Sequence, residues 1–148
     1  MKYAVAVRTL CEFTAKQGDL DLRFTPTPTA QEGIAGHVLV ASRRGADYQS
    51  EISLAGEFQH LAVRGRADGY DPVQNQLEEI KTFRGELASM PANHRYLHWA
   101  QVKVYGHLLC EKLGLREIRL ALVYFDIIAK QETVLSELYN AATLKQGF

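Results

Sequence analysis

Two carboxylates and a lysine near the middle of the chain, Asp68, Glu79 and Lys81, are of the types that act on phosphodiester bonds. Hydrolysis of such a bond needs a hydroxide near neutral pH and positive charge beside the phosphate, and a divalent cation held by clustered oxygen ligands supplies both. Asp68 ends one predicted strand and Glu79 lies in the next, so both carboxylates can face one cation. Strand alternation puts Glu79 and Lys81 on one face and Ile80 on the other, toward the core. Lys81 would then orient the attacking water or offset charge on the phosphate.

Three further residues accompany this set, His37 in a predicted helix before the strands and Gln101 and Tyr105 in a helix after them. Gln101 and Tyr105 are four residues apart and therefore share a helix face. The order of these elements resembles that of the PD-(D/E)XK nucleases, in particular their RecB-like exonuclease branch. The likeness spans about residues 30–110, and the set is more specific than any one member: His37, Asp68, Glu79-x-Lys81 and Gln101-x3-Tyr105.

This resemblance implies a restriction-endonuclease-like α/β fold, in which a central mixed sheet is flanked by helices. It implies cleavage of DNA at or near an end, dependent on Mg²⁺ or Mn²⁺. The implied metal ligands are His37, Asp68, Glu79 and the Ile80 carbonyl. The implied catalytic residues are Asp68, Glu79 and Lys81, and those in contact with DNA are Gln101 and Tyr105.

A subset of these nucleases, associated with CRISPR systems, carries four cysteines that hold an iron–sulfur cluster. This chain has Cys11 and Cys110 alone, so no iron–sulfur cluster is expected. The segments VRTLCEFTAKQGDLDLRF and PTAQEGIAGH resemble the nuclease part of larger bacterial helicases of the DinG/XPD type. That likeness implies a domain excised from a longer helicase–nuclease, with a helicase domain as its partner.

The bulk composition is that of an ordinary soluble protein, with 47% hydrophobic and 23% charged residues. At 148 residues we expect a single domain over residues 1–148. No apolar run approaches the roughly 20 residues that span a bilayer, and the N-terminus lacks a signal-peptide layout. A cytoplasmic location is the default expectation, without a membrane partner.

Net charge is zero, with 17 basic and 17 acidic residues, whereas a DNA-binding protein usually has a basic surplus. Carboxylates that hold cations are neutralised when loaded, which softens this objection. Basic residues also cluster locally. Arg64, Arg66 and Arg84 could contact phosphates, or they could simply be solvated.

Periodicity predicts the element order α-α-β-β-β-α-β-β. Helices are expected over residues 5–16, ending at Gly18-Asp19; from a Thr29–Glu32 capping box to about residue 44; and from Pro91 to Leu113, closed by Gly114. The second helix places Ile34, His37, Val38 and Ala41 on one side, and the third is expected to expose Lys103, His107 and Glu111. The FTPTPT segment must run extended.

Alternating residues predict an antiparallel meander over 48–54, 58–68 and 76–83. A continuous apolar run over 117–125 predicts a buried strand, and a weaker strand follows at 131–135. The last residues, 144–148, have a helical pattern.

Plainer roles remain open for each candidate residue. Asp68 could be an Asx-turn residue before Gly69, and Glu79 and Lys81 could form the solvated face of an edge strand. His37 could be a core histidine, and Gln101 and Tyr105 could be helix packing. The alternative functions are a catalytically idle DNA-binding module of a helicase, a structure-specific endonuclease such as a junction resolvase, and a protein-interaction domain.

Overall fold

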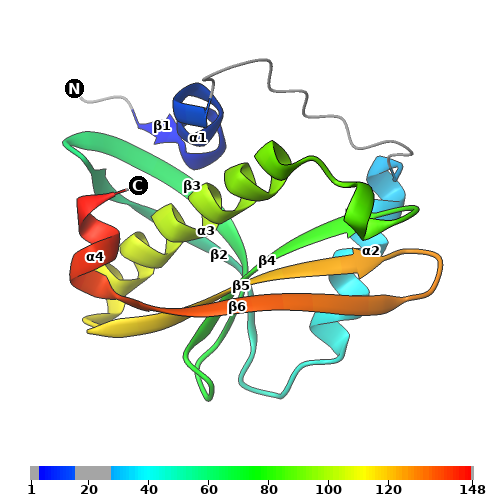
Figure 1. Cartoon of the computed structure of the whole chain (residues 1–148). Helices are drawn as coiled ribbons and strands as arrows, with labels where there is room; N and C mark the ends of the chain where they lie inside the picture. Colours follow the sequence, from blue (N-terminus) through cyan, green and yellow to red (C-terminus); the bar gives the residue numbers. More distant parts are fainter. Residues whose placement is uncertain (1–3, 16–27, 148) are drawn as a thin grey trace.

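A computed structural model of the chain describes residues 4–15 and 28–147 (Figure 1). The expected end of the first helix at Gly18-Asp19 and most of the FTPTPT segment lie outside the described residues. The strands are β1 (Val5–Ala6), β2 (Gln49–Phe58), β3 (Leu61–Asp71), β4 (Gln76–Phe83), β5 (Glu117–Asp126) and β6 (Gln131–Asn140). The helices are α1 (Val7–Ala15), α2 (Ala30–Ser42), α3 (Ala92–Leu113) and α4 (Ala141–Gln146), with a short 3-10 turn η1 (Leu87–Ser89).

The described strands form one six-stranded mixed sheet, so the expected fold class is confirmed. Its order is β1-β3-β4-β5-β6, and β2 also pairs with β3. β2, β3 and β4 form the expected antiparallel meander, whereas β5 runs parallel to β4 and antiparallel to β6. Because β4 and β5 are parallel, the chain must cross over between them, and α3 is that crossover.

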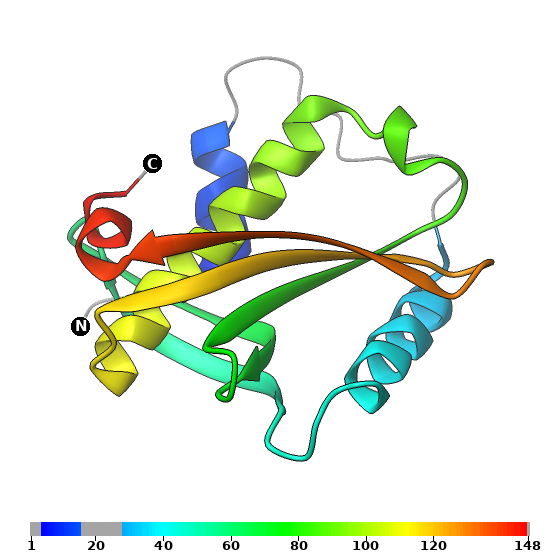
Figure 2. The same ribbon diagram turned by 60° about the horizontal axis from the view of Figure 1, so that its bottom comes forward.

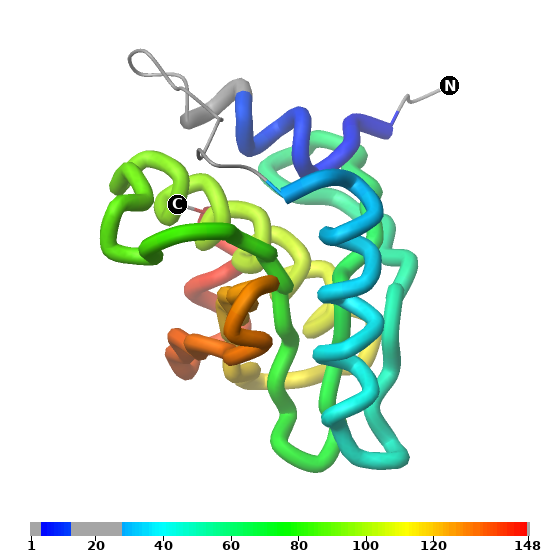
Figure 3. Tube along the Cα trace, turned by 90° about the vertical axis from the view of Figure 1, so that its right-hand side faces the viewer, coloured from blue at the N-terminus to red at the C-terminus, as the bar shows by residue number. Residues whose placement is uncertain are grey.

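Helices cover both faces of the sheet. α1 and α3 lie on one face and α2 lies on the other, as Figure 2 shows. α2 runs lengthwise beside the neighbouring strands in the side view of Figure 3. The larger core lies under α1 and α3, and a smaller apolar cluster under α2 consists of Val40, Ile80, Val123 and Phe125. Within the described residues, no helix is both long and apolar enough to cross a membrane.

The local signals at the start of α2 and at the end of α3 are confirmed. The Thr29 hydroxyl accepts a hydrogen bond from the Glu32 amide, and the Glu32 carboxylate accepts one from the Thr29 amide, which is the predicted capping box. Glu32 also forms an ion pair with Arg84, so it does more than cap the helix. Gly114 ends α3 with a left-handed backbone, φ 68°, which glycine adopts without strain.

The side of α2 that contacts the sheet is not the side that carries the apolar residues Ile34 and Val38. Ile34 and Val38 are 67% and 64% exposed, whereas Gly36 and Val40 are buried. A Cβ added at Gly36 would lie 2.5 Å from Thr82 Cγ2, so the helix backbone approaches the sheet closely at this glycine. The side of α2 that packs against the sheet is therefore the side where the helix backbone comes close to the strands, and not the side with the largest apolar side chains.

The expectation that His107 is exposed is wrong. His107 is 4% exposed, and its Nε2 lies 2.8 Å from the Glu57 carbonyl oxygen. α3 packs against the sheet, α1 and α4, so its second half is buried on nearly all sides. Several boundaries also shift. Val5 and Ala6 form β1 before α1 begins, and β6 extends to Asn140. β2 runs to Phe58 and β3 runs to Asp71, so Asp68 lies inside its strand rather than at the end.

Candidate active site

The site lies where β3 and β4 separate. One edge of β3 pairs with β2 along its length. Its other edge pairs with β1 at Val63 and Arg64, and with β4 from Gly69 to Asp71. Between Arg64 and Gly69 this second edge has no strand partner among the described residues, and Asp68 lies in that gap.

Asp68 fills the gap with its side chain. Its Oδ2 accepts a hydrogen bond of 2.7 Å from the Ile80 main-chain N–H. The carboxylate thus does for β4 what a backbone carbonyl of β3 would do in a continuous ladder. Asp68 is therefore not an Asx-turn residue, because it binds an amide on another strand rather than the next residues of its own.

Glu79 and Lys81 project from β4 toward the α1 and α3 side, as strand alternation predicts. Glu79 is 7% exposed, and its Oε1 lies 3.3 Å from Lys81 Nζ. Its Oε2 is buried and makes no hydrogen bond within the described part of the chain. β4 lies between β3 and β5, so the interpretation of Glu79 and Lys81 as a solvated edge-strand face is wrong.

His37 reaches the same place from α2. Its Nδ1 lies 3.6 Å from Asp68 Oδ1, and its imidazole hydrogen-bonds the backbone of Ile80. The side chain is 40% exposed, which does not fit a core histidine. Burial lowers the pKa of His37, so the ring is neutral near pH 7, and neutral imidazole is the form that ligates metals.

Gln101 and Tyr105 approach from α3. Gln101 is 4% exposed, and its Oε1 has no hydrogen-bond partner among the described residues. The Tyr105 hydroxyl lies against the backbone of β3, where a Cβ on Gly65 would come within 2.6 Å of it. Gly65 is thus a residue that the motif did not indicate, and its lack of a side chain lets Tyr105 reach the sheet beside Asp68.

One pocket of about 310 Å³ gathers most of the predicted site. Arg8 of α1 and Thr82 of β4, which the sequence did not single out, also line it. Arg64 and Arg66 are exposed on β3 and line a neighbouring hollow with Ser53, Leu54 and Ala55, so the structure does not bring them into this pocket. The residues that share the pocket are Arg8, His37, Asp68, Glu79, Ile80, Lys81, Thr82, Gln101 and Tyr105.

The pKa values of the neighbouring Asp68 and Glu79 carboxyl groups are both raised. Burial raises the pKa of Asp68, and the Ile80 hydrogen bond and the Lys81 charge partly oppose this. Burial also raises the pKa of Glu79, and the nearby Asp68 charge adds to the shift. Two adjacent carboxylates with raised pKa values gain most from a cation between them.

The described residues contain no group of three or more His, Cys, Asp and Glu side chains arranged to hold a metal ion. The predicted side-chain ligands His37, Asp68 and Glu79 are therefore not arranged around one point: Asp68 Oδ2 is held by the Ile80 amide, and Glu79 turns Oε1 toward Lys81. The donor types still suit Mg²⁺ or Mn²⁺, and the buried Glu79 Oε2 and the Asp68 Oδ1 both remain available as ligands.

No protein-family model matches this chain, and no curated protein matches it in sequence. Solved structures do match it. The crystal structure of SSO0001 superposes with a TM-score of 0.57 at 20% sequence identity, over 99% of this chain and 73% of that one. A protein from Eubacterium rectale that is named as an exonuclease superposes with a TM-score of 0.51 at 15% identity, over 88% of this chain and 50% of that one. The chain shares its fold with these proteins.

At these identities the likeness concerns the fold alone. The mixed sheet with helices on both faces is therefore the architecture of an exonuclease-named protein, which agrees with the fold class expected from the motifs. The finer assignments, to the RecB-like branch and to a DinG/XPD-type helicase, remain predictions from the sequence.

Proposed function

We propose that this chain is a divalent-metal-dependent deoxyribonuclease that acts at the pocket between β3, β4 and α3. The observation that supports this most is the convergence of residues from four elements on that pocket. His37, Asp68, Glu79, Lys81 and Gln101 lie far apart in the sequence and line one hollow of the molecule. The shared fold with an exonuclease-named protein supports the same reaction class.

In this proposal Asp68, Glu79, His37 and the Ile80 carbonyl hold Mg²⁺ or Mn²⁺. The cation supplies an ionised water at neutral pH and neutralises charge on the phosphate. Asp68 is suited to share its carboxylate, since Oδ2 is engaged by the Ile80 amide while Oδ1 faces His37. Glu79 Oε2 is the second oxygen ligand, and it is already desolvated.

Lys81 and Gln101 act on the substrate. The Lys81 ammonium lies 3.3 Å from Glu79 Oε1, so it stands beside the proposed cation and can stabilise charge on the scissile phosphate. The Gln101 amide, buried with an unpaired oxygen, can accept a hydrogen bond from a base or from the attacking water. Arg8 at the rim of the pocket, with exposed Arg64 and Arg66 on β3, supplies positive charge for neighbouring phosphates.

The substrate in this proposal is DNA with a free end or a single-stranded stretch. The test is an assay on end-labelled single- and double-stranded DNA, and on circular DNA, with Mg²⁺, Mn²⁺ or EDTA. We expect metal-dependent degradation of linear DNA by the wild type and by Glu111→Gln, which neutralises an exposed acid on α3, and none by Glu79→Gln.

One observation favours an alternative, a DNA-binding module without catalysis: the side chains of the described residues do not already form a closed metal site. DNA binding without cleavage under every metal condition would support that module. Cleavage of branched circles without end dependence would indicate a structure-specific endonuclease instead.

A further inference from the structure

Glu78 lies one residue before Glu79 and on the opposite face of β4, where it is 3% exposed. Its carboxylate accepts hydrogen bonds from Arg44 Nε at 3.0 Å, Tyr48 Oη at 2.8 Å and Gln76 Nε2 at 2.9 Å. Glu78 is therefore paired rather than solvated. Every donor comes from a side chain, so the position of this carboxylate is fixed by its neighbours.

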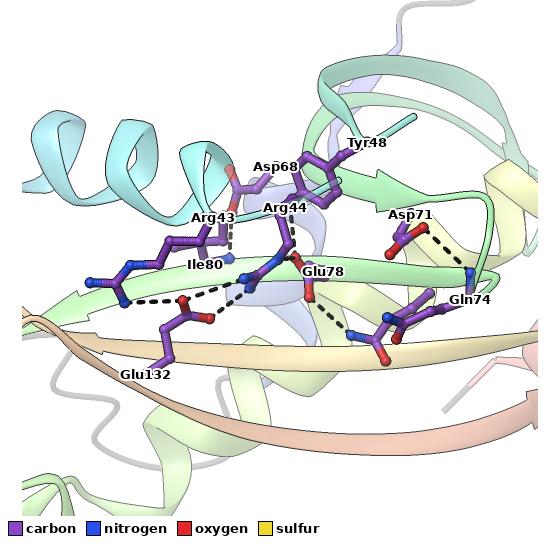
Figure 4. Close-up of polar contacts among 10 residues, drawn as sticks. Arg43, Arg44, Tyr48, Asp68, Asp71, Gln74, Glu78, Ile80 and Glu132 are labelled. Atoms are coloured by element: carbon purple, nitrogen blue, oxygen red, sulfur yellow. Dashed lines mark hydrogen bonds and ion pairs between the residues drawn. The ribbon is translucent and has the colours of Figure 1, made fainter. Parts of the chain in front are cut away.

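Arg44 carries the connection across the sheet. Its Nη2 lies 2.7 Å from Glu132 Oε1, so one guanidinium joins Glu78 on β4 to Glu132 on β6 (Figure 4). Arg43 also donates to Glu132, and it donates at 2.7 Å to the Lys130 carbonyl oxygen. The end of α2, the helix that carries His37, is thereby tied to the strands on this face.

Tyr48 extends the same network to β3. A Cβ on Gly69 would lie 1.7 Å from Tyr48 Oη, so the phenol occupies the space that a side chain at residue 69 would need. Gly69 and Glu78 are register partners, and they are the last paired residues before β3 and β4 separate. The next residues toward the site are Asp68 on β3 and Glu79 on β4.

Net stability alone does not account for such a network. Moving an arginine and two glutamates out of water is costly, and packed apolar residues of similar size often stabilise a fold as well or better. What an apolar cluster lacks is directional bonding that holds strands at one spacing. The network stands at the point where two strands part and present their carboxylates.

We propose that Glu78, Arg44 and Tyr48 are positioning residues for the metal site. Together they fix the separation of β3 and β4 at the Gly69–Glu78 pair, and so set the distance between the Asp68 and Glu79 carboxylates. Through Arg44 they also fix the end of α2, and with it the approach of His37. The inference rests on the proposed function, because it assigns these residues to the site that binds the cation.

The test replaces three members of the network by apolar residues, in the variant Arg44→Met/Tyr48→Phe/Glu78→Leu. Glu132 keeps Arg43 as a partner, and the half-buried Gln76 can turn its amide to solvent. The single variant Glu78→Ala removes the one carboxylate oxygen that accepts from both Arg44 and Tyr48, and so cuts the link from β4 to both side chains. The matched control is Arg43→Met, which loses contacts to Glu132 and Lys130 but touches neither Glu78 nor β3. Each protein is measured for melting temperature, for hydrogen exchange of the Ile80 amide in EDTA, and for Mn²⁺ affinity by calorimetry.

We expect the triple variant to melt near the wild-type temperature but to lose protection at the Ile80 amide, because the Asp68 carboxylate no longer lies at a fixed distance. We expect Mn²⁺ affinity to fall about 10- to 100-fold, the usual loss when a group that orients a ligand is removed. Glu78→Ala should show the same losses, and Arg43→Met should show neither.

Wild-type Ile80 protection in both network variants would overturn the positioning role. Should the triple variant fail to fold, Glu78→Ala alone decides the outcome. If the wild type itself binds no Mn²⁺, the proposed function fails, whereas Ile80 protection still separates positioning from mere stabilisation. Unchanged Mn²⁺ affinity in the folded network variants, beside clear binding by the wild type, would overturn this inference and leave the proposed function intact.

Discussion

Asp68 and Ile80 are joined by a hydrogen bond of 2.7 Å between the Asp68 carboxylate and the Ile80 main-chain N–H. This bond closes the gap where β3 and β4 separate, and it ties the aspartate to the strand that carries Glu79 and Lys81. The same residue is therefore a structural partner through Oδ2 and a candidate metal ligand through Oδ1. Its two roles can be separated by substitution.

Asp68→Asn keeps an oxygen for the Ile80 amide and removes the charge, whereas Asp68→Ala removes both. We expect Mn²⁺ affinity to fall strongly in both variants and in Glu79→Ala. We expect a loss of stability in Asp68→Ala that Asp68→Asn largely avoids, about 1–3 kcal/mol for the unpaired amide. Calorimetry with Mn²⁺ and chemical unfolding measure the two effects. Equal Mn²⁺ affinity in wild type, Asp68→Ala and Glu79→Ala would refute the metal assignment.

The metal-free protein should become more stable as the pH falls from about 7 to about 5, between the folded and the unfolded pKa of Glu79. Burial raises the pKa of Glu79 from 4.5 to about 7 in the folded state, so folding takes up a proton in this range. The stabilisation is fully present below the unfolded pKa and is lost as the pH rises through about 7. Unfolding in EDTA at several pH values measures it.

Glu79→Gln is the control for this pH dependence. It removes the titrating group, so its stability should vary less with pH, and it should exceed that of the wild type at the alkaline end. A wild-type profile that rises with pH over the same range, or one that Glu79→Gln leaves unaltered, would show that Glu79 is not the group responsible.

Gly65 should tolerate no side chain. A Cβ at this position would lie 2.6 Å from the Tyr105 hydroxyl and 2.8 Å from its ring, so Tyr105 or β3 would have to move. We expect Gly65→Ala to cost about 1–3 kcal/mol of stability, as overpacking usually does. The control is Gly45→Ala, where nothing lies within 4 Å of the added carbon. Thermal melts of the two variants should differ clearly, and similar melts would mean that Tyr105 is not held against β3.

His37 should tune which metal supports activity. An imidazole nitrogen suits Mn²⁺ better than the harder Mg²⁺, so we expect higher activity with Mn²⁺ and a smaller Mn²⁺ advantage in His37→Ala. Val38→Ala, on the same helix and exposed, should leave the ratio unchanged. Initial cleavage rates with each metal give the ratio. A wild-type ratio in His37→Ala would mean that the imidazole does not ligate the cation.

Local patterns were sufficient for most of the fold. The Thr29 capping box, Gly114 and the apolar run of β5 each depend on a few neighbouring residues, and the structure confirms all three. The burial of His107 could not be read from its own helix, because strand β2 covers it: its Nε2 lies 2.8 Å from the Glu57 carbonyl oxygen and its ring packs against Phe58. Periodicity reports which residues share a face and not how many faces are covered.

The motif residues were identified by type and order, yet their surroundings were not. Glu78 matches a solvated strand residue in sequence, and only the return of residues 43–48 to β4 supplies Arg44 and Tyr48 as its partners. Gly65 carries no chemical signal at all, and its importance appears once Tyr105 is placed against it. Contacts between residues so distant in the chain depend on the tertiary fold.

Lys81 should affect the rate of cleavage rather than metal binding or folding. Its ammonium lies 3.3 Å from Glu79 Oε1 and ligates nothing while protonated. We expect Lys81→Ala to keep Mn²⁺ affinity, DNA affinity and melting temperature near wild type, and to lose roughly 10²-fold or more in rate, as when one preorganised charge-stabilising donor is removed. Lys81→Arg should not restore the rate, because a planar guanidinium does not occupy the compact ammonium position. Single-turnover cleavage with saturating Mn²⁺ isolates the chemical step. Near-wild-type cleavage by folded, metal-loaded Lys81→Ala would show that this lysine is only a partner of Glu79 on the strand.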